Sequence, residues 1–146
     1  MRTVTATETR PLRHLVLRPG QPAESTIYPG DDDPDTRHFA AFVGGQLVGI
    51  ASLYREARPG ADIVPGWRLR GMATSGEARG KGVGRALLAA CLEHVAAHGG
   101  GEVWCNARAG ALGFYSAAGF HVEGEEFEIP GIGLHRVMRR HVARAL

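Results

Sequence analysis

The stretch Arg79-Gly80-Lys81-Gly82-Val83-Gly84 decides how this 146-residue chain is interpreted. It follows a β-rich run at residues 67–74. The segment after it places apolar side chains at helical spacing: Leu87, Leu88, Cys91, Leu92 and Val95. A glycine-rich loop that leads into a helix exposes several backbone N–H groups where the helix dipole adds partial positive charge. We therefore expect this loop to bind a phosphate group.

Two well-known phosphate-binding loops do not match the stretch. A Walker A loop needs glycine at position 75, where Ser75 stands, and a hydroxyl residue after Lys81, where Gly82 stands. The dinucleotide motif G-x-G-x-x-G ends on glycine, but Arg85 or Leu87 occupies that place here. A nucleotide-binding protein, which would be stabilised by ATP or NAD, is therefore the third choice among function classes.

The rest of the chain alternates helical and β-rich segments. Glycine and proline clusters, including a loop at 56–66, separate them. The first expected elements are a helix at 9–18 with Pro11 in its first turn and a hairpin of strands 38–43 and 47–55. A strand at 67–74, interrupted by Gly71, is followed by a helix that ends at Gly99, Gly100 and Gly101. The remaining elements are a strand at 102–106, a helix at 109–118, a return to strand from Phe120, and final strands near 125–129 and 134–140. Leu12, Leu15 and Val16 form the apolar stripe of the first helix. This order predicts one α/β domain, residues 1–146, with a mixed, mostly antiparallel sheet, a central βαβ unit and flanking helices.

Three segments in order carry a family resemblance. Arg79, Gly82 and Gly84 fit R-x-x-G-x-G, which resembles the pyrophosphate-binding signature of the GCN5-related N-acetyltransferase (GNAT) superfamily. Met72-Ala73-Thr74 occupies the strand position before that loop. Downstream, the pattern N…A…FY…GF is reproduced by Asn106, Ala111, Phe114-Tyr115 and Gly119-Phe120. The resemblance spans residues 67–121 and is to the small stand-alone bacterial members.

This resemblance implies an enzyme that uses acetyl-CoA as co-substrate. The acetyl group would pass to a primary amine of a small-molecule acceptor, by direct attack of the amine on the thioester. The residues implied in acetyl-CoA binding are Met72, Ala73, Thr74, Arg79, Gly80, Lys81, Gly82, Val83, Gly84, Arg85, Asn106 and Tyr115. The alternative is a non-catalytic acyl-CoA binding or sensing module on the same fold.

The resemblance also implies catalytic roles. Tyr115 stands where the family has its general acid, and a peptide N–H near Met72 or Ala73 would stabilise the oxyanion. The final strand pair lines the acceptor side in this family, so Glu126 and His135 are candidate bases, with Glu128 as a further carboxylate. Surface charge is the alternative interpretation of each of these three.

Other charged residues have two interpretations each. Arg68 and Arg70 share one face of a strand and would suit an anionic acceptor, but solvated arginines explain them equally well. The acidic stretch 29–35 is expected to be a solvated turn, because it lacks the spacing of a calcium loop. His38 also has two interpretations, a capping residue or a partner of Asp35.

Composition narrows the class of partner. A formal net charge of +2 does not indicate a nucleic-acid binder, and no apolar run has membrane-spanning length. Cys91 and Cys105 lack C-x-x-C spacing, so we expect buried free thiols and no metal. We expect a cytoplasmic protein; the resemblance is compatible with a homodimer, and no motif identifies the acceptor.

Overall fold

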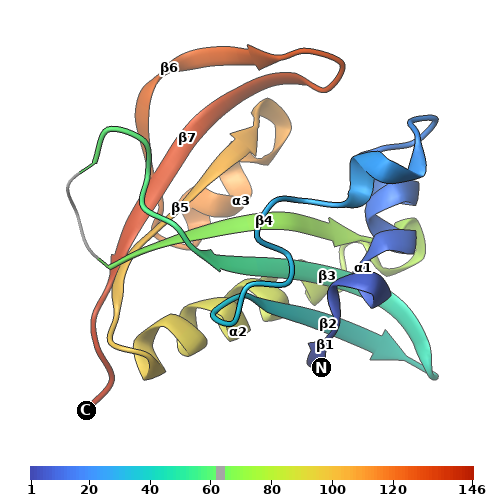
Figure 1. Cartoon of the computed structure of the whole chain (residues 1–146), viewed down its shortest axis with the longest axis horizontal. Helices are drawn as coiled ribbons and strands as arrows, with labels where there is room; N and C mark the ends of the chain where they lie inside the picture. Colours follow the sequence, from blue (N-terminus) through green and yellow to red (C-terminus); the bar gives the residue numbers. More distant parts are fainter. Residues whose placement is uncertain (62–64) are drawn as a thin grey trace. The chain divides into compact units, whose positions relative to one another are not determined.

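The protein is described by a computed structural model in which residues 1–61 and 65–146 are placed (Figure 1). Residues 62–64 of the predicted 56–66 loop lie outside the described residues. The chain forms two compact units: unit 1 comprises Met1–Arg55 and Leu69–His94, and unit 2 comprises Glu56–Arg68 and Val95–Leu146. Each unit is built from two separate stretches of chain. The expectation of one domain over residues 1–146 stays a prediction.

Seven strands and three α-helices are present among the described residues. The strands are β1 Arg2–Val4, β2 Arg37–Val43, β3 Gln46–Arg55, β4 Gly66–Thr74, β5 Gly101–Arg108, β6 His121–Ile129 and β7 Gly133–Val142. The helices are α1 Ala6–Leu12, α2 Val83–Ala97 and α3 Leu112–Ala117, with a π-helical turn η1 Arg13–Leu17 and 3₁₀ turns η2 Ala23–Thr26, η3 Gly76–Ala78 and η4 Ala109–Ala111. The strand order is β1-β2-β3-β4-β5-β7-β6. Strands β4 and β5 pair in parallel, whereas β1–β2, β2–β3, β5–β7 and β6–β7 pair antiparallel. The predicted α/β class, with a mixed sheet and a β4-α2-β5 unit, is confirmed.

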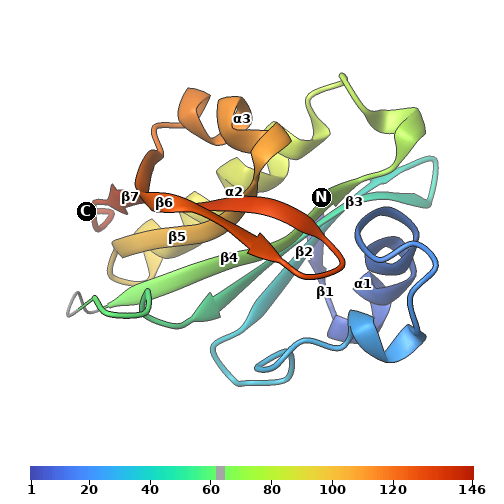
Figure 2. The ribbon, with the colours of Figure 1, turned by 90° about the horizontal axis from the view of Figure 1, so that it is seen from above.

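In unit 1, helices cover both faces of the β2–β3 hairpin (Figure 2). Phe39 lies opposite Ala51, and its ring meets His94 of α2 edge to face at 5.8 Å. On the other face, Ala40 and Ile50 lie opposite each other and form a buried cluster with Leu12 of α1. Side chains alternate between the faces of a strand, so α1 and η1 cover the face that also carries His38, Ser52 and Tyr54.

The first helix departs from the prediction in its limits and its exposed face. It begins at Ala6, because the Thr5 hydroxyl caps it by accepting from the Glu8 N–H at 3.3 Å. Pro11 therefore lies in its second turn rather than its first. From residue 13 the chain winds as a wider π-helical turn, which shifts side chains around the axis relative to a 3.6-residue period. Leu15, predicted on the buried stripe, is consequently 71% exposed, and Arg13 points inward instead.

In unit 2, β5 pairs with β7 along its whole length and with the first residues of β4. Strand β6 is continuous from His121 to Ile129, whereas two segments were predicted. A register shift between Glu123 and Phe127 divides its pairing with β7, and Gly124 in that bulge has φ +80°. The last predicted strand, 134–140, lies within β7.

The two cysteines of the chain lie in α2 and β5. Cys91 and Cys105 are buried free cysteines, and burial raises the pKa of each thiol to about 12. Within the described ranges, no three His, Cys, Asp or Glu side chains are grouped to hold a metal ion. No helix found in those same ranges has both the length and the apolar character needed to span a bilayer.

Candidate active site

The glycine-rich loop lies in unit 1, directly before α2. After the η3 turn, Arg79 is extended, and Gly80 and Gly82 both adopt left-handed backbone, with φ +77° and +81°. Residues 79–82 are exposed, and α2 begins at Val83. The first N–H groups of a helix have no partner within it, so the amides at the start of α2 are available to an anion.

Space around the loop is open. A Cβ added at Gly80 or Gly82 would meet no heavy atom within 4 Å. The Ser75 N–H donates to the Val48 carbonyl at 2.8 Å, but the buried Ser75 hydroxyl has no hydrogen-bond partner among the described residues. Exposed amides, a positive helix terminus and an unused hydroxyl are the groups that a ligand with phosphate and amide oxygens would engage.

The strand before the loop is deformed where the sequence predicted. Gly71 has φ +68°, and a Cβ there would lie 3.4 Å from both the Arg13 Nε and the Tyr28 ring. The position therefore favours glycine for its backbone angle and its close neighbours. Beyond it, Ala73 is buried, and Met72 and Thr74 are half-buried.

A buried ion pair lies beneath this strand in unit 1. Arg13 is fully buried, and its guanidinium donates to both carboxylate oxygens of Asp31, at 2.8 and 3.1 Å. It also donates to the Thr26 carbonyl and the Ser52 hydroxyl. The Tyr54 hydroxyl donates to Asp31 at 2.6 Å. The prediction of a solvated acidic turn is wrong at Asp31, which is buried because Arg13 neutralises it.

The electrostatics of this network favour the charged carboxylate. Burial alone raises the pKa of Asp31, but hydrogen bonds from Arg13 and Tyr54 outweigh it and lower that pKa to about 2. His38 Nε2 lies 2.9 Å from the Asp31 carbonyl, so it donates there, and Nδ1 accepts from the Ser52 hydroxyl at 2.6 Å. Its partners are thus Asp31 and Ser52, not the predicted Asp35. Burial lowers the pKa of His38 and keeps the ring neutral.

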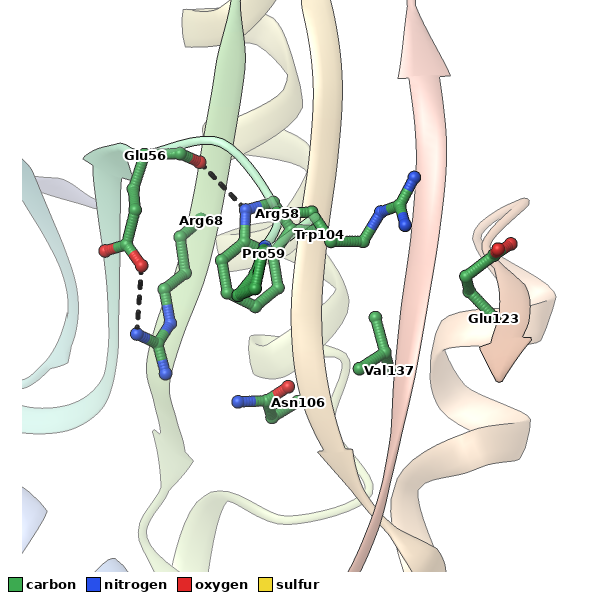
Figure 3. A pocket seen from close by; sticks show the side chains of 8 residues that line it. All are labelled: Glu56, Arg58, Pro59, Arg68, Trp104, Asn106, Glu123 and Val137. Carbon is green, nitrogen blue, oxygen red and sulfur yellow. Dashed lines mark hydrogen bonds and ion pairs between the residues drawn. The ribbon is translucent and has the colours of Figure 1, made fainter. Parts of the chain in front are cut away.

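Unit 2 contains a pocket of about 330 Å³ (Figure 3). It is lined by Glu56, Arg58, Pro59, Arg68, Trp104, Asn106, Glu123 and Val137. The Arg68 guanidinium lies over the Trp104 indole, 5.0 Å from the ring centroid, and donates to Glu56 at 3.3 Å. The indole N–H donates to the Glu56 carbonyl at 2.8 Å, which fixes the ring.

The other charges of this pocket form a second chain of ion pairs. Arg58 donates through Nε and Nη2 to both oxygens of buried Glu102, at 3.1 and 3.3 Å. Arg139 lies 3.7 Å from Glu102 and donates to Glu123 at 2.9 Å. The hydrogen bond from Arg139 lowers the pKa of Glu123.

Several predicted site residues lie on the face of the sheet that carries this pocket. Asn106 lines the pocket, opposite Val137 in the β5–β7 register. His135 is two residues along β7 from Val137 and therefore shares its face. Its Nδ1 lies 2.8 Å from the Gly133 carbonyl and donates to it, so Nε2 carries the lone pair when the ring is neutral. His135 is buried and stacks on Phe127 at 5.9 Å.

The two carboxylates predicted beside His135 differ from it in exposure. Glu126 is exposed and lies in the β6 bulge, outside the residues paired with β7. Glu128 is also exposed and lies opposite Leu134. The described contacts give neither carboxylate a hydrogen bond that would orient it.

Tyr115 lies in α3 and is buried in an aromatic cluster. Its ring packs edge to face against Phe114 at 5.0 Å and Phe120 at 5.5 Å. The backbone continues this contact, because the Phe120 N–H donates to the Tyr115 carbonyl. The FY…GF pattern therefore has a packing role within unit 2, whichever chemical role Tyr115 has.

Arg68 and Arg70, predicted as a pair, have different surroundings. Arg68 belongs to unit 2 and lies over Trp104, whereas Arg70 belongs to unit 1 and lies 4.1 Å from the Tyr28 ring centroid. Trp104 and Glu56 are pocket residues that were not predicted from the sequence. No local motif marks them, because they meet Arg68 only through the parallel pairing of β4 with β5 and the preceding turn of chain.

Comparison with known proteins agrees with this architecture. The sequence profile of the acetyltransferase (GNAT) domain matches residues 17–140. The chain is 37% identical over 138 residues to YitI, an uncharacterized N-acetyltransferase of Bacillus subtilis, covering 94% of this chain and 93% of YitI. The fold resembles Escherichia coli ElaA, with a TM-score of 0.78 and 23% identity over 95% of this chain and 97% of ElaA. It also resembles an aminoglycoside 6'-N-acetyltransferase solved in complex with coenzyme A, with a TM-score of 0.74 and 14% identity over 100% of this chain and 99% of that one. The chain belongs to the GNAT family of acetyltransferases.

Proposed function

We propose that this N-acetyltransferase takes its acetyl group from acetyl-CoA and transfers it to a primary amine of a small molecule. The observation that carries the proposal is the open loop before α2, where two left-handed glycines and the start of a 15-residue helix present backbone amides to solvent. A fully charged diphosphate is the kind of group that such a loop stabilises. The proposal places the reaction in the cytoplasm; a homodimer stays a prediction.

Different residues would bind different parts of acetyl-CoA. Backbone amides of residues 80–85 would hold the pyrophosphate, and Arg79, Lys81 and Arg85 would add positive charge at its edge. The buried Ser75 hydroxyl and the edge groups of Met72 to Thr74 would pair with the amide-containing arm. Two of the implied cofactor residues, Asn106 and Tyr115, belong to unit 2 instead, and Asn106 lines its pocket.

The chemistry needs one group that accepts a proton and one that donates it. Nitrogen attacks the thioester carbon, an N–C bond forms, the C–S bond breaks, and the nitrogen loses a proton while the thiolate gains one. His135 is the base that its surroundings favour, because the Gly133 carbonyl holds the tautomer with a lone pair on Nε2. Tyr115 is the proposed donor to sulfur. A peptide N–H near Met72 or Ala73, just after the deformed Gly71, would stabilise the oxyanion.

The proposed binding of the pyrophosphate by this loop is tested with Gly82→Val. A side chain there enters the space through which a diphosphate would approach the amides, so we expect the dissociation constant for acetyl-CoA to rise at least about tenfold by calorimetry. Gly45→Val is the matched control, since Gly45 has nearly the same φ, +80° against +81°, and equally open surroundings, but lies in the β2–β3 turn. Equal affinity in both variants, with folding intact, would place the phosphates elsewhere.

The reaction itself is tested by release of free thiol from acetyl-CoA across an amine panel. Tyr115→Phe should lower kcat by about 100-fold or more, because general-acid catalysis contributes on the order of 10²–10⁴. An unchanged kcat would remove Tyr115 from the mechanism. Tight acetyl-CoA binding without turnover of any amine would instead favour the acyl-CoA binding module.

A further inference from the structure

We infer that the pocket of unit 2 binds the acceptor, and that this acceptor is an amine that also carries a carboxylate, which Arg68 recognises. The inference rests on the proposed function for the acceptor being an amine. Its own basis is the pocket, which offers an aromatic floor, one loosely engaged guanidinium and a carboxamide without a hydrogen-bond partner among the described residues (Figure 3).

The two guanidiniums that line the pocket are engaged very differently. Arg58 makes two hydrogen bonds to Glu102, whose side chain is 4% exposed, so this pair belongs to the framework. Within the described part of the chain, Arg68 makes one hydrogen bond, at 3.3 Å, to Glu56, whose side chain is 45% exposed. A single contact to an exposed carboxylate contributes little free energy. A ligand carboxylate can therefore replace Glu56 as the partner of Arg68 at small cost.

Arg68 is nevertheless held in position. Its guanidinium lies over the Trp104 ring, and the hydrogen bond from the indole N–H to the Glu56 carbonyl fixes that ring. The Arg68 side chain is only 19% exposed. A planar guanidinium fixed on an aromatic face and partly shielded from water is suited to carboxylate recognition, because less side-chain entropy is lost and the charge is less screened.

The remaining lining suits a small aminocarboxylate. The Asn106 side chain has no hydrogen bond to any described residue and offers both a donor and an acceptor. Val137 adds an apolar wall, and His135 follows it on the same face of β7. A volume of about 330 Å³ lies at the lower end of the range for small-molecule sites, which fits a molecule of amino-acid size.

The test compares L-amino acids with their carboxamides, which keep the amine and lose the carboxylate. Wild-type protein should prefer the carboxylate in kcat/KM by about 10- to 100-fold, as expected for one charge-assisted contact. In Arg68→Gln that preference should fall toward one through a higher KM for the amino acid, with Arg68→Lys intermediate. Glu56→Gln should lower the KM for the amino acid, because Arg68 loses its internal competitor. Arg144→Gln, an exposed arginine of unit 2, should leave the preference unchanged.

Two results would overturn the inference while leaving the proposed function intact: equal use of amino acids and carboxamides by wild-type protein, or an equal loss for both in Arg68→Gln. If no amine is acetylated, the proposed function fails, and calorimetric titration with the amino-acid panel still tests the pocket. Binding that Arg68→Gln abolishes would support the carboxylate site. Absence of binding to wild-type protein would refute it.

Discussion

Unit 1 and unit 2 each contain an arginine–carboxylate pair, and the two pairs are built in opposite ways. In unit 1, the Asp31 carboxylate is 3% exposed and accepts from Arg13 through both oxygens. In unit 2, the Glu56 carboxylate is 45% exposed and accepts from Arg68 once, at 3.3 Å. The first pair is shielded from solvent, whereas the second lines an open pocket.

The difference shows which pair the fold depends on. A buried carboxylate must be neutralised and hydrogen-bonded, because an uncompensated buried charge costs several kcal/mol. Asp31 meets this need with Arg13, Tyr54 and the Tyr28 N–H, and so joins the η1 turn, the loop after η2 and strand β3. The exposed Glu56 carboxylate carries no such cost, so Arg68 can change partner. Burial with several hydrogen bonds therefore marks the structural pair, and a single hydrogen bond to an exposed carboxylate marks the candidate for recognition.

The largest expected effect is on the buried pair. Asp31→Asn leaves the Arg13 guanidinium buried without its counter-charge, so the free energy of unfolding should fall by about 3–5 kcal/mol, measured by urea denaturation at pH 7. Asp35→Asn is the control, since Asp35 is exposed in the same acidic stretch. That variant should stay within about 0.5 kcal/mol of wild type. A loss below about 1 kcal/mol in Asp31→Asn would mean that the pair is not the anchor of unit 1.

A smaller effect should appear as pH dependence. Burial holds the pKa of His38 below the 6.5 of the unfolded chain, among neighbours that include Arg13, Asp31, Asp32 and Tyr54. As pH falls through 6.5, the unfolded chain takes up a proton before the folded protein does, so stability decreases. Asp31 acts in the same direction at lower pH: its contribution is present above 3.8 and is lost as pH falls toward about 2.

Urea midpoints measured from pH 7.5 to pH 5 separate the two groups, because Asp31 stays ionised over this interval. His38→Gln should flatten the dependence there, and His141→Gln, at an exposed position of β7, should retain it. A slope that survives in His38→Gln would assign the titration to another group.

The backbone of the glycine-rich loop was predictable because its signal is local. The glycines within residues 79–84 predict a left-handed backbone by themselves, and Gly80 and Gly82 both have a positive φ. Gly71 was predictable for the same reason. The start of α1 was also encoded locally, by Thr5 and Glu8 in capping-box spacing, although the helix was predicted to begin at residue 9.

The two ion pairs were not predictable, because their partners meet only in the folded chain. Arg13 and Asp31 are 18 residues apart, and Asp31 stands among three other aspartates that are exposed. Arg68 meets Trp104 only in the parallel register of β4 with β5. The π-helical turn that directs Arg13 inward breaks the 3.6-residue period on which the helix prediction relied. Local patterns therefore predicted backbone conformation, and long-range pairing determined which charges are buried.

The smallest expected effect completes the comparison between the two pairs. Glu56→Gln removes the carboxylate partner of Arg68, as Asp31→Asn removes that of Arg13, yet the free energy of unfolding should change by less than about 0.5 kcal/mol under the same urea conditions. The physical reason is that water can solvate the released Arg68 guanidinium at the pocket, whereas it cannot reach Arg13. A loss comparable to that of Asp31→Asn would show that Arg68 is a framework residue like Arg58. A negligible loss means that any change in KM in this variant reports on ligand recognition rather than on a weakened fold.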